Sequence, residues 1–358
     1  MKNKLILIAC FLFLKNIAHA QVENIIIITT DGYRWQELFA GVDTAIANNR
    51  RFNEGDSAYI YKNYWDADPA ESRKKLTPFI WNTIITKGSI YGNRNAGNKV
   101  DVANPYWFSY PGYSEIFTGY ADPAVNSNDY KPNPNITLLE FLNTQPRFKN
   151  KIAAFGAWEA FDRILNQQRS GLPVFSAFDT VNGNLTSRQK LINQMLINSY
   201  RPWKDGECLD VFTHYAAMEY LKSKKPKVLF IGYGETDEWA HHAMYRSYLD
   251  AAHQVDKWLA EIWDYVQTDP AYKNKTALFI TTDHGRGDAV KSQWTSHGSS
   301  IKGANETWFM VMAPRLPAKG EIKTEAQYYT QQMAQTIASL LGTTYKASHP
   351  VGEKIALK

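Results

Sequence analysis

The stretch "NIIIITTDG" at residues 24–32 places four isoleucines in a row and ends in Asp31 and Gly32. Strands of a buried parallel sheet are covered on both faces, so they read as short continuous apolar or β-branched runs. Four other runs share this pattern: residues 151–155, 227–233, 276–282 and 307–314. The five runs predict five strands of one buried sheet.

Helices are predicted between these strands. In residues 245–266 apolar side chains recur at spacings of three or four, which is typical of one buried helix face. Residues 137–145 and 328–342 are shorter amphipathic candidates. Strands that alternate with helices predict an α/β fold with a doubly wound, mostly parallel sheet flanked by helices. The polar, aromatic stretches 48–102 and 170–210 are expected to be loop insertions, and residues 21–358 to form a single domain.

The first twenty residues have the pattern of a secretory signal peptide. Two lysines precede an apolar stretch, and the small-residue sequence Ala18-His19-Ala20 follows it. A lipoprotein site at Cys10 is the alternative, but few apolar residues precede that cysteine. We therefore expect a periplasmic or secreted protein that begins near Gln21 and has no transmembrane anchor, since no later apolar run is long enough to cross a bilayer.

Removal of this segment changes the charge and the cysteine count. Loss of Lys2, Lys4 and Lys15 lowers the formal charge from +5 to +2, which does not indicate a nucleic-acid polymer as partner. Only Cys208 remains, so the mature chain cannot form an internal disulfide.

Potential metal ligands follow three of the five predicted strands, and one more lies on a loop before the last strand. They are three carboxylates and three imidazoles: Asp31, Asp237, His241, Asp283, His284 and His297. Taken singly, each has an ordinary explanation, because Asp before Gly is a common turn residue and a lone histidine usually bonds a backbone carbonyl. Taken together, most of them lie at the carboxyl ends of strands, where open α/β sheets bind ligands. The donor mix suits two borderline divalent ions, most of all zinc.

The remaining histidines do not share this placement. His214 and His253 occur within helix-like apolar spacing, His242 adjoins His241, and His349 lies in the C-terminal tail. We expect structural roles for all four.

The segments "TTDG", "GETDEWAH", "TTDHG" and "SHG" resemble, in the same chain order, the metal-binding segments of the alkaline phosphatase superfamily. The pair Asp237 and His241, four residues apart, is most similar to the nucleotide pyrophosphatase/phosphodiesterase branch. The resemblance spans residues 23–314. It implies that one ion is held by Asp31, Ser109, Asp283 and His284, and the other by Asp237, His241 and His297.

The same resemblance implies a hydroxyl nucleophile. The segment "NPYWFSYPGYSEIFTGYAD" places it at Ser109, with Ser114 as the competitor inside the following helix. A serine hydroxyl is a poor nucleophile unless a metal or a base helps to remove its proton, so a dinuclear site suits it. Relatives carry an asparagine that donates to a phosphoryl oxygen, and "AVNSNDY" offers Asn126 and Asn128, of which Asn128 is preferred.

Three further residues are candidates for substrate binding. Trp158 stands where some phosphomonoesterase relatives carry a Lys-x-Arg pair, and it is either a stacking surface for the substrate or a core aromatic. Arg34 and Arg286 adjoin the metal ligands, and each either replaces the missing positive charge or forms an ion pair with the ligands.

The resemblance implies a dinuclear-metal hydrolase of small phosphoric esters that acts through a phosphoseryl intermediate, and the signal-peptide pattern adds that it is exported. Phosphodiester or nucleotide-like substrates are favoured over monoesters, because the Lys-x-Arg pair is replaced. A sulfatase is the rival within the superfamily, although Tyr113 stands where the sulfatase pattern has arginine. A non-catalytic protein that binds a ligand through its metals is the alternative from another class. The sequence does not indicate an oligomeric state.

Overall fold

The computed structural model describes residues 22–357. The predicted signal peptide at residues 1–20, and with it the lipoprotein alternative at Cys10, lies outside the described residues.

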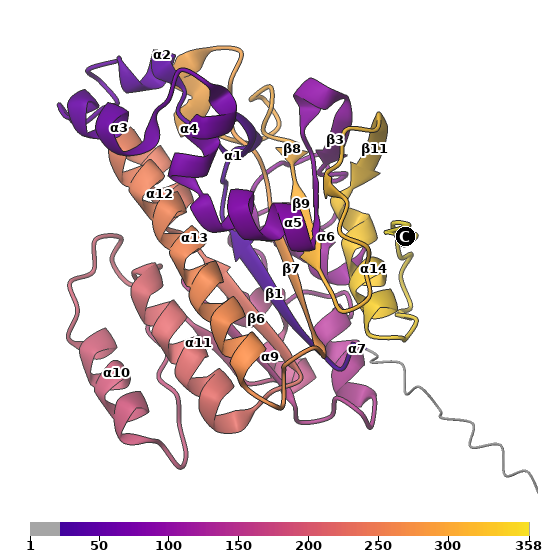
Figure 1. Ribbon diagram of the computed structural model, residues 1–358. Helices are drawn as coiled ribbons and strands as arrows, with labels where there is room; N and C mark the ends of the chain where they lie inside the picture. Colours follow the sequence, from indigo (N-terminus) through magenta and orange to yellow (C-terminus); the bar gives the residue numbers. More distant parts are fainter. Residues whose placement is uncertain (1–21, 358) are drawn as a thin grey trace, which may run out of the picture.

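The centre of the protein is an eight-stranded sheet with the order β10-β2-β9-β7-β1-β6-β4-β5 (Figure 1). Five strands run parallel: β1 (Asn24–Thr30), β4 (Ile152–Gly156), β5 (Val174–Ser176), β6 (Val228–Tyr233) and β7 (Thr276–Thr282). The strand β9 (Phe309–Met312) is antiparallel to both β7 and β2 (Ser89–Tyr91). At the edge, β10 (Gly320–Glu321) pairs with β2. The predicted α/β fold with a mostly parallel sheet is confirmed.

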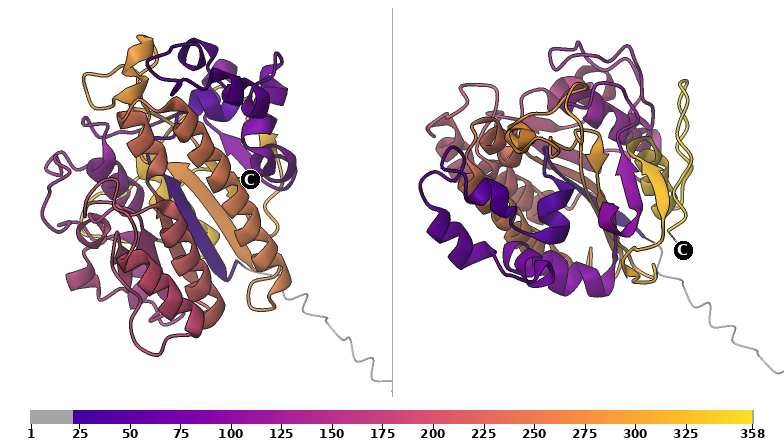
Figure 2. Two further views of the ribbon diagram at one scale, coloured as in Figure 1. Left: turned by 90° about the vertical axis from the view of Figure 1, so that its left-hand side faces the viewer. Right: turned by 90° about the horizontal axis from the view of Figure 1, so that it is seen from above.

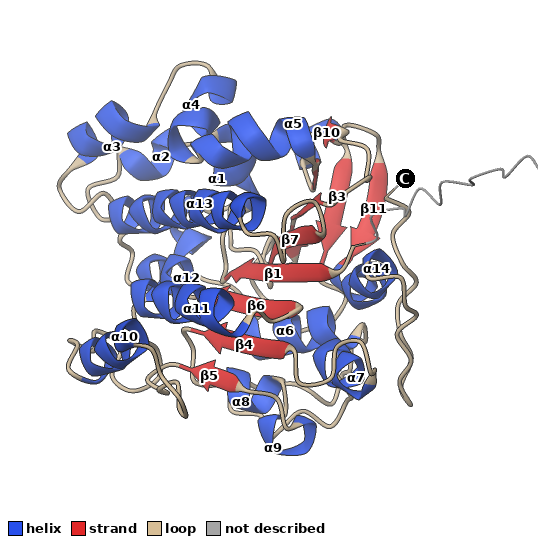
Figure 3. Cartoon of the chain, turned by 60° about the horizontal axis from the view of Figure 1, so that its bottom comes forward, coloured by secondary structure: helices blue, strands red, loops and turns tan. Residues whose placement is uncertain are grey.

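Helices cover both faces of this sheet (Figure 3). Along β1, Ile26 and Ile28 join the core shared with α11 (Asp210–Lys224) and α13 (Tyr245–Thr268). The alternate residues Ile25 and Ile27 join the core shared with α6 (Ser109–Thr118), α7 (Leu138–Thr144) and α14 (Met333–Leu340). The strand is therefore apolar throughout because each face supports a separate core.

Shorter elements complete the fold. The other helices are α1 (Trp35–Ala40), α2 (Thr44–Ala47), α3 (Ser57–Tyr64), α4 (Pro69–Leu76), α5 (Ile85–Lys87), α8 (Phe161–Ile164), α9 (Gln167–Ser170), α10 (Ser187–Ile197) and α12 (Glu235–His241). A π turn spans Ile80–Ile84, and 3₁₀ turns span Arg94–Ala96, Lys291–Thr295 and Thr330–Gln332. A second, small sheet has the order β11-β3-β8, with β3 (Asn98–Asp101), β8 (Glu306–Thr307) and β11 (Ala326–Tyr329).

The two stretches expected to be loop insertions also contribute strands, which corrects that expectation. Residues 48–102 include β2 and β3, and residues 170–210 include β5 at the edge of the main sheet. These strands have only three or four residues, too few for a periodic pattern to appear in the sequence. Likewise, the predicted strand at 307–314 is divided between β8 and β9, and Tyr328 and Tyr329 belong to β11 rather than to a helix.

The carboxyl ends of β1, β6 and β7 point toward the top of Figure 1. The N-terminal helices α1 to α4 and the segment between β7 and β8 lie at this same end of the sheet (Figures 1 and 2). An ion pair between Lys291 and Asp43, with Nζ and Oδ2 at 2.7 Å, connects these two segments. Of the helices within residues 22–357, none combines the length and the apolarity that a membrane crossing requires.

Candidate active site

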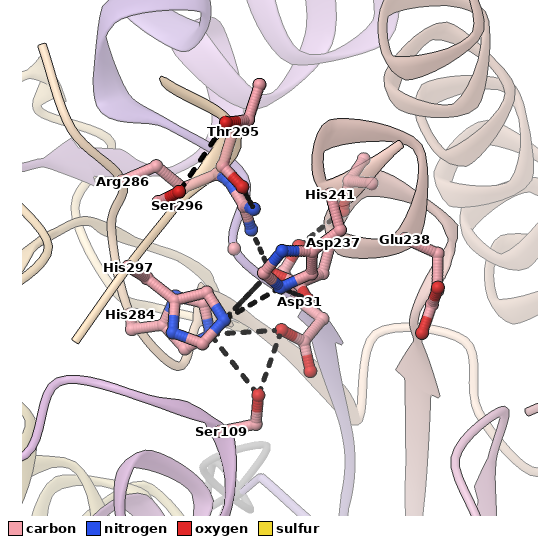
Figure 4. A network of polar contacts seen from close by, with 12 residues as sticks. Asp31, Ser109, Asp237, Glu238, His241, His284, Arg286, Thr295, Ser296 and His297 are labelled. Atoms are coloured by element: carbon pink, nitrogen blue, oxygen red, sulfur yellow. Dashed lines mark hydrogen bonds and ion pairs between the residues drawn. The ribbon is translucent and has the colours of Figure 1, made fainter. Parts of the chain in front are cut away.

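The predicted ligands meet at the carboxyl edge of the three central strands. Because β7, β1 and β6 are neighbours, Asp31, Asp283 and the N-terminus of α12 follow strands that end side by side. Helix α12 begins two residues after β6 and carries Asp237 and His241 one turn apart. The loop after β7 brings His297 to the same place (Figure 4).

One group of donors consists of Asp31, Asp283 and His284, whose ligand atoms all lie within 4.8 Å of one another. His284 Nε2 is 3.2 Å from Asp31 Oδ1 and 3.5 Å from Asp283 Oδ2. Asp283 Oδ1 accepts a hydrogen bond from the Gly32 amide at 3.1 Å. Asp283 Oδ2 is buried and has no hydrogen-bond partner among the described residues. A buried carboxylate oxygen with no donor is a vacant ligand for a cation.

A second group consists of Asp237, His284 and His297. His241 adjoins it, because His241 Nε2 lies 2.9 Å from both Asp237 Oδ2 and His297 Nε2. The resemblance assigned His284 to the first ion alone, but its Nε2 also lies 3.8 Å from Asp237 Oδ1. The two donor groups are therefore contiguous and share His284, which lies beside His297 (Figure 4).

The protonation of these residues fits a bound cation. His284 Nδ1 lies 2.9 Å from the Gly285 carbonyl, to which it donates, so Nε2 keeps its lone pair for a metal. Burial alone would lower the pKa of His284, but the carboxylates of Asp283 and Asp31 raise it to about 9. Burial and the charge of Asp31 hold the pKa of Asp283 well above its usual range. Without metal, the cluster thus keeps protons where a divalent cation would otherwise supply positive charge.

Ser109 is the first residue of α6, and its side chain reaches the first donor group. Its Oγ lies 3.3 Å from His284 Nε2 and 3.5 Å from Asp31 Oδ1. All ten residues of α6 are buried, and Gly112 lets the helix approach the end of β7 closely, because a Cβ there would lie 2.5 Å from the Asp283 carbonyl oxygen. The competitor Ser114 lies in the interior of α6, where its Oγ accepts a hydrogen bond from Asn133 at 3.0 Å.

Glu115 holds the loop that leads into Ser109. Its carboxylate is completely buried and accepts hydrogen bonds from the backbone amides of Ala103, Asn104 and Gln331 at 2.8–3.1 Å. At the other end of the loop, the Trp107 carbonyl accepts from the Gly298 amide at 2.9 Å. The Ser109 loop is thereby joined to the His297 loop. The role of Glu115 could not be predicted from the sequence, because an acidic residue inside a helix carries no distinguishing pattern.

Asn128 lies at the N-terminus of α6. Its Oδ1 accepts a hydrogen bond from the Tyr110 amide at 2.9 Å, while its backbone carbonyl accepts from Arg163 at 3.3 Å. The Asn128 side chain therefore contacts the backbone of Tyr110, the residue that follows Ser109. The side-chain nitrogen of Asn128 takes no part in that hydrogen bond. Asn126, in contrast, is exposed.

The two arginines beside the ligands are both buried and both engaged. Arg34 pairs with Glu37, with Nε and Oε2 at 2.9 Å, and donates to the Gly287 carbonyl and to Asp288. Arg286 pairs with Asp237 and donates to the carbonyls of Trp294 and Thr295. Arg286 thus forms the ion pair with a predicted ligand that the sequence left open, whereas Arg34 pairs with Glu37 and Asp288, which are not predicted ligands. Trp158 is partly exposed and forms an isolated antiparallel bridge with Glu207.

Arg286→Met should weaken metal binding, because the guanidinium both orients Asp237 and fixes the loop that carries His297. Residues that orient metal ligands typically contribute about 10- to 100-fold in affinity. Equilibrium dialysis with zinc measures the change, and Arg315→Met, at an exposed arginine, is the matched control. Unchanged zinc affinity in Arg286→Met would contradict the positioning role.

The four histidines expected to be structural lie in other contacts. His214 is buried, 2.8 Å from the Tyr233 hydroxyl, and stacks on Trp258. The other three contact backbone carbonyl oxygens: His242 that of Glu238, His253 that of Leu76, and His349 those of Ile136 and Pro350.

Comparisons with known proteins agree with this geometry. A sequence model described as "Metalloenzyme superfamily" matches residues 179–301, which contain Asp237, His241, Asp283, His284 and His297. This match supports a divalent-metal site. No curated protein matches the chain.

Three solved structures show the same fold. Wild-type alkaline phosphatase PafA is 10% identical, with a TM-score of 0.60 over 94% of this chain and 98% of that one. A putative sulfatase from Bacteroides thetaiotaomicron is 14% identical, with a TM-score of 0.60 over 94% and 74%. Phosphonate monoester hydrolase of Agrobacterium radiobacter is 12% identical, with a TM-score of 0.56 over 93% and 76%. The chain thus shares the fold of these three proteins, so the alkaline-phosphatase-like fold implied by the resemblance is confirmed.

Proposed function

We propose that the protein is an exported hydrolase of phosphoric esters that uses two divalent metal ions and acts through a phosphoseryl intermediate. The observation that carries this proposal is the position of Ser109 Oγ, 3.3 Å from His284 Nε2 and 3.5 Å from Asp31 Oδ1, beside two contiguous groups of metal donors. A non-catalytic ligand-binding protein has no need of a hydroxyl held there by a buried helix.

Two ions fit the residues present. Asp31, Asp283 and His284 would hold one together with Ser109, and Asp237, His241 and His297 would hold the other. Three carboxylates and three imidazoles suit zinc better than calcium or magnesium, which prefer oxygen ligands. When bound, such ions act as Lewis acids that stabilise negative charge on a serine alkoxide and on phosphoryl oxygens.

The protein residues then account for two displacements at phosphorus. Ser109 Oγ attacks, the bond from Oγ to phosphorus forms, and the ester bond breaks as the alcohol leaves with the proton that Ser109 gave up. Water next cleaves the phosphoseryl ester, which restores the hydroxyl and releases the second product. The N-terminus of the ten-residue helix α6 faces the developing negative charge, and Asn128 Nδ2 donates to a phosphoryl oxygen.

The engagement of Arg34 and Arg286 favours diesters over monoesters. A monoester brings two negative charges and a diester brings one, and both arginines beside the ligands are bound to carboxylates. Against a sulfatase, the position of its pattern arginine is occupied by Tyr113, which is completely buried. We therefore propose small phosphodiester or nucleotide-like substrates.

The experiment is metal analysis by mass spectrometry of the purified mature protein, with parallel assays of three p-nitrophenyl esters. About two zinc ions per chain are expected, with bis-p-nitrophenyl phosphate cleaved faster than p-nitrophenyl phosphate. One calcium with cleavage of p-nitrophenyl sulfate would instead assign a sulfatase. Bound metal without turnover of any ester would assign a binding protein.

A further inference from the structure

The exposed apolar side chains of the protein are gathered in one region. Eight large apolar side chains are exposed among residues 22–357, and six of them lie between residues 191 and 215: Leu191, Met195, Ile197, Tyr200, Val211 and Tyr215. Tyr200 is the most exposed, at 82%. Single exposed apolar residues are ordinary on a protein surface, whereas a gathered set is typical of an interaction surface.

These side chains belong to α10, to the loop after it and to the first turns of α11. The two helices run antiparallel to each other. At one end, Arg188 Nη1 lies 3.3 Å from Glu219 Oε1, and at the other, Leu196 and Phe212 pack in one small core cluster. On this flank of the protein α10 is the outermost helix, and α11 separates it from the sheet (Figures 1 and 3).

Helix α10 is apolar on two sides. Leu196 is buried in the contact with α11, whereas Leu191 and Met195, one turn apart, are 55% and 53% exposed. A helix that only covers its neighbour has polar side chains on its outer face. The outer apolar side chains of α10 therefore require a second partner to explain them.

The same two segments are strongly basic. Residues 180–204 and 211–225 contain seven lysines or arginines and a single acid, Glu219. Four of the seven cations form ion pairs, and the other three, Lys190, Lys204 and Lys224, form none among residues 22–357. We call the six apolar side chains, together with the lysines and arginines of these two segments, the apolar-basic surface.

This composition disfavours a second copy of the chain as the partner. In a twofold dimer the same surface lies on both subunits, so its cations would face those of the other copy. The centres of protein interfaces are also depleted in charged residues, lysine among them. An anionic lipid surface, in contrast, is complementary to the cations and offers an apolar layer to the side chains between them.

We propose that the apolar-basic surface docks the protein on an anionic phospholipid membrane, with α10 in the plane of the headgroups. Leu191 and Met195 enter the boundary between headgroups and acyl chains. Tyr200 lies at the level of the headgroups, where aromatic side chains with a polar end are enriched. Lys190 and Lys204 bind lipid phosphates. This docking does not depend on the chemistry at Ser109.

The test is co-sedimentation of the protein with lipid vesicles. Protein without residues 1–20 is used, so that the predicted signal peptide does not contribute. At about 0.1 M sodium chloride, vesicles of equal parts phosphatidylcholine and phosphatidylglycerol should bind at least about tenfold more protein than vesicles of phosphatidylcholine alone. At about 1 M salt, where the Debye length falls to about 3 Å, this preference should be lost. Failure to bind the anionic vesicles, or equal binding to both kinds, would overturn the inference.

The apolar contribution is tested with Leu191→Ser/Met195→Ser, which should bind the anionic vesicles several-fold more weakly than wild type. Val290→Ser/Tyr329→Ser, at the two exposed apolar side chains outside the apolar-basic surface, is the matched control and should bind like wild type. Because all four positions are exposed, both variants should melt at the wild-type temperature in calorimetry. Wild-type vesicle binding in Leu191→Ser/Met195→Ser would contradict the docking of α10.

The charge contribution is tested with Lys190→Glu/Lys204→Glu, which should remove the preference for anionic vesicles. Lys319→Glu/Lys323→Glu makes the same change in charge at two exposed lysines outside the apolar-basic surface and should keep the preference. Equal losses in the two variants would show that net charge alone directs the binding, which would overturn the inference.

A second copy of the chain is the alternative occupant, and analytical ultracentrifugation tests it. Without vesicles, wild type and Leu191→Ser/Met195→Ser should sediment as the same species. A dimer that forms in wild type and is lost in that variant would assign the surface to self-association and overturn the inference. Vesicle binding is measured without any ester, so failure of the proposed function would leave these results unchanged.

Discussion

Ser109→Ala should abolish turnover of every phosphoric ester while the protein still binds its full complement of metal. Removal of an attacking hydroxyl leaves only positioning and charge stabilisation, and losses on the order of 10³-fold or more in kcat are usual for such a change. The six other predicted ligands remain in place, so metal content by mass spectrometry should stay at the wild-type value.

The matched control is Ser114→Ala, in the same buried helix. Ser114 Oγ accepts a hydrogen bond from Asn133, so its loss should reduce stability by about 1 kcal/mol and leave the rate constants close to wild type. Steady-state kinetics of both variants on bis-p-nitrophenyl phosphate decide the assignment. Wild-type rates in Ser109→Ala would show that another group attacks phosphorus.

Removal of metal should have the second largest effect: loss of turnover together with a lower melting temperature. Asp31 and Asp283 are buried side by side, and without a cation their mutual repulsion is relieved only by protons and by His284. Dialysis against a chelator followed by calorimetry measures the fall in Tm, and added zinc should restore both stability and activity.

The metal-free protein should also lose stability as pH rises from about 6.5 to about 9. The pKa of His284 is raised from 6.5 to about 9, because nearby carboxylates outweigh the effect of burial. A raised histidine pKa contributes stability that is complete below the unfolded value of 6.5 and is lost as pH rises through the folded value. Calorimetric scans of chelator-treated protein at pH 6.5 and pH 9 should differ by several degrees in Tm. The same difference in His284→Gln would show that other groups cause it, and His349→Ala, in the C-terminal tail, is the control.

The parts of the fold that could be predicted from sequence are those with long uniform patterns. The run of isoleucines in β1 predicted a strand covered on both faces, and the spacing in residues 245–266 predicted α13 almost to its ends. The strand ends then placed Asp31, Asp237, Asp283 and His284 together, because parallel strands that neighbour one another end at one edge. Local patterns and one rule of topology are enough to predict these features.

Other features depend on contacts between segments that are distant in sequence. Glu207 is 27 positions before Gly234, the residue at the start of α12 that it lies against, and nothing in "KDGECLD" distinguishes it from an ordinary surface acid. Arg34 and Arg286 form ion pairs with the carboxylates that the fold brings close to them. Their positions in the sequence do not show which carboxylates those are. Three-residue strands such as β2 and β5 exist because a neighbouring strand offers them hydrogen bonds.

Helix α6 is buried along its whole length, whereas Glu207 and Trp203 belong to the insertion at residues 170–210. Substitutions in α6 would disturb the core that supports folding, so we expect few substitutions around Ser109 to be compatible with a folded protein. The insertion contributes fewer residues to the core, among them Leu172, Val174 and Val181. Most positions of the insertion can therefore change with less effect on folding than positions of the helix that carries Ser109.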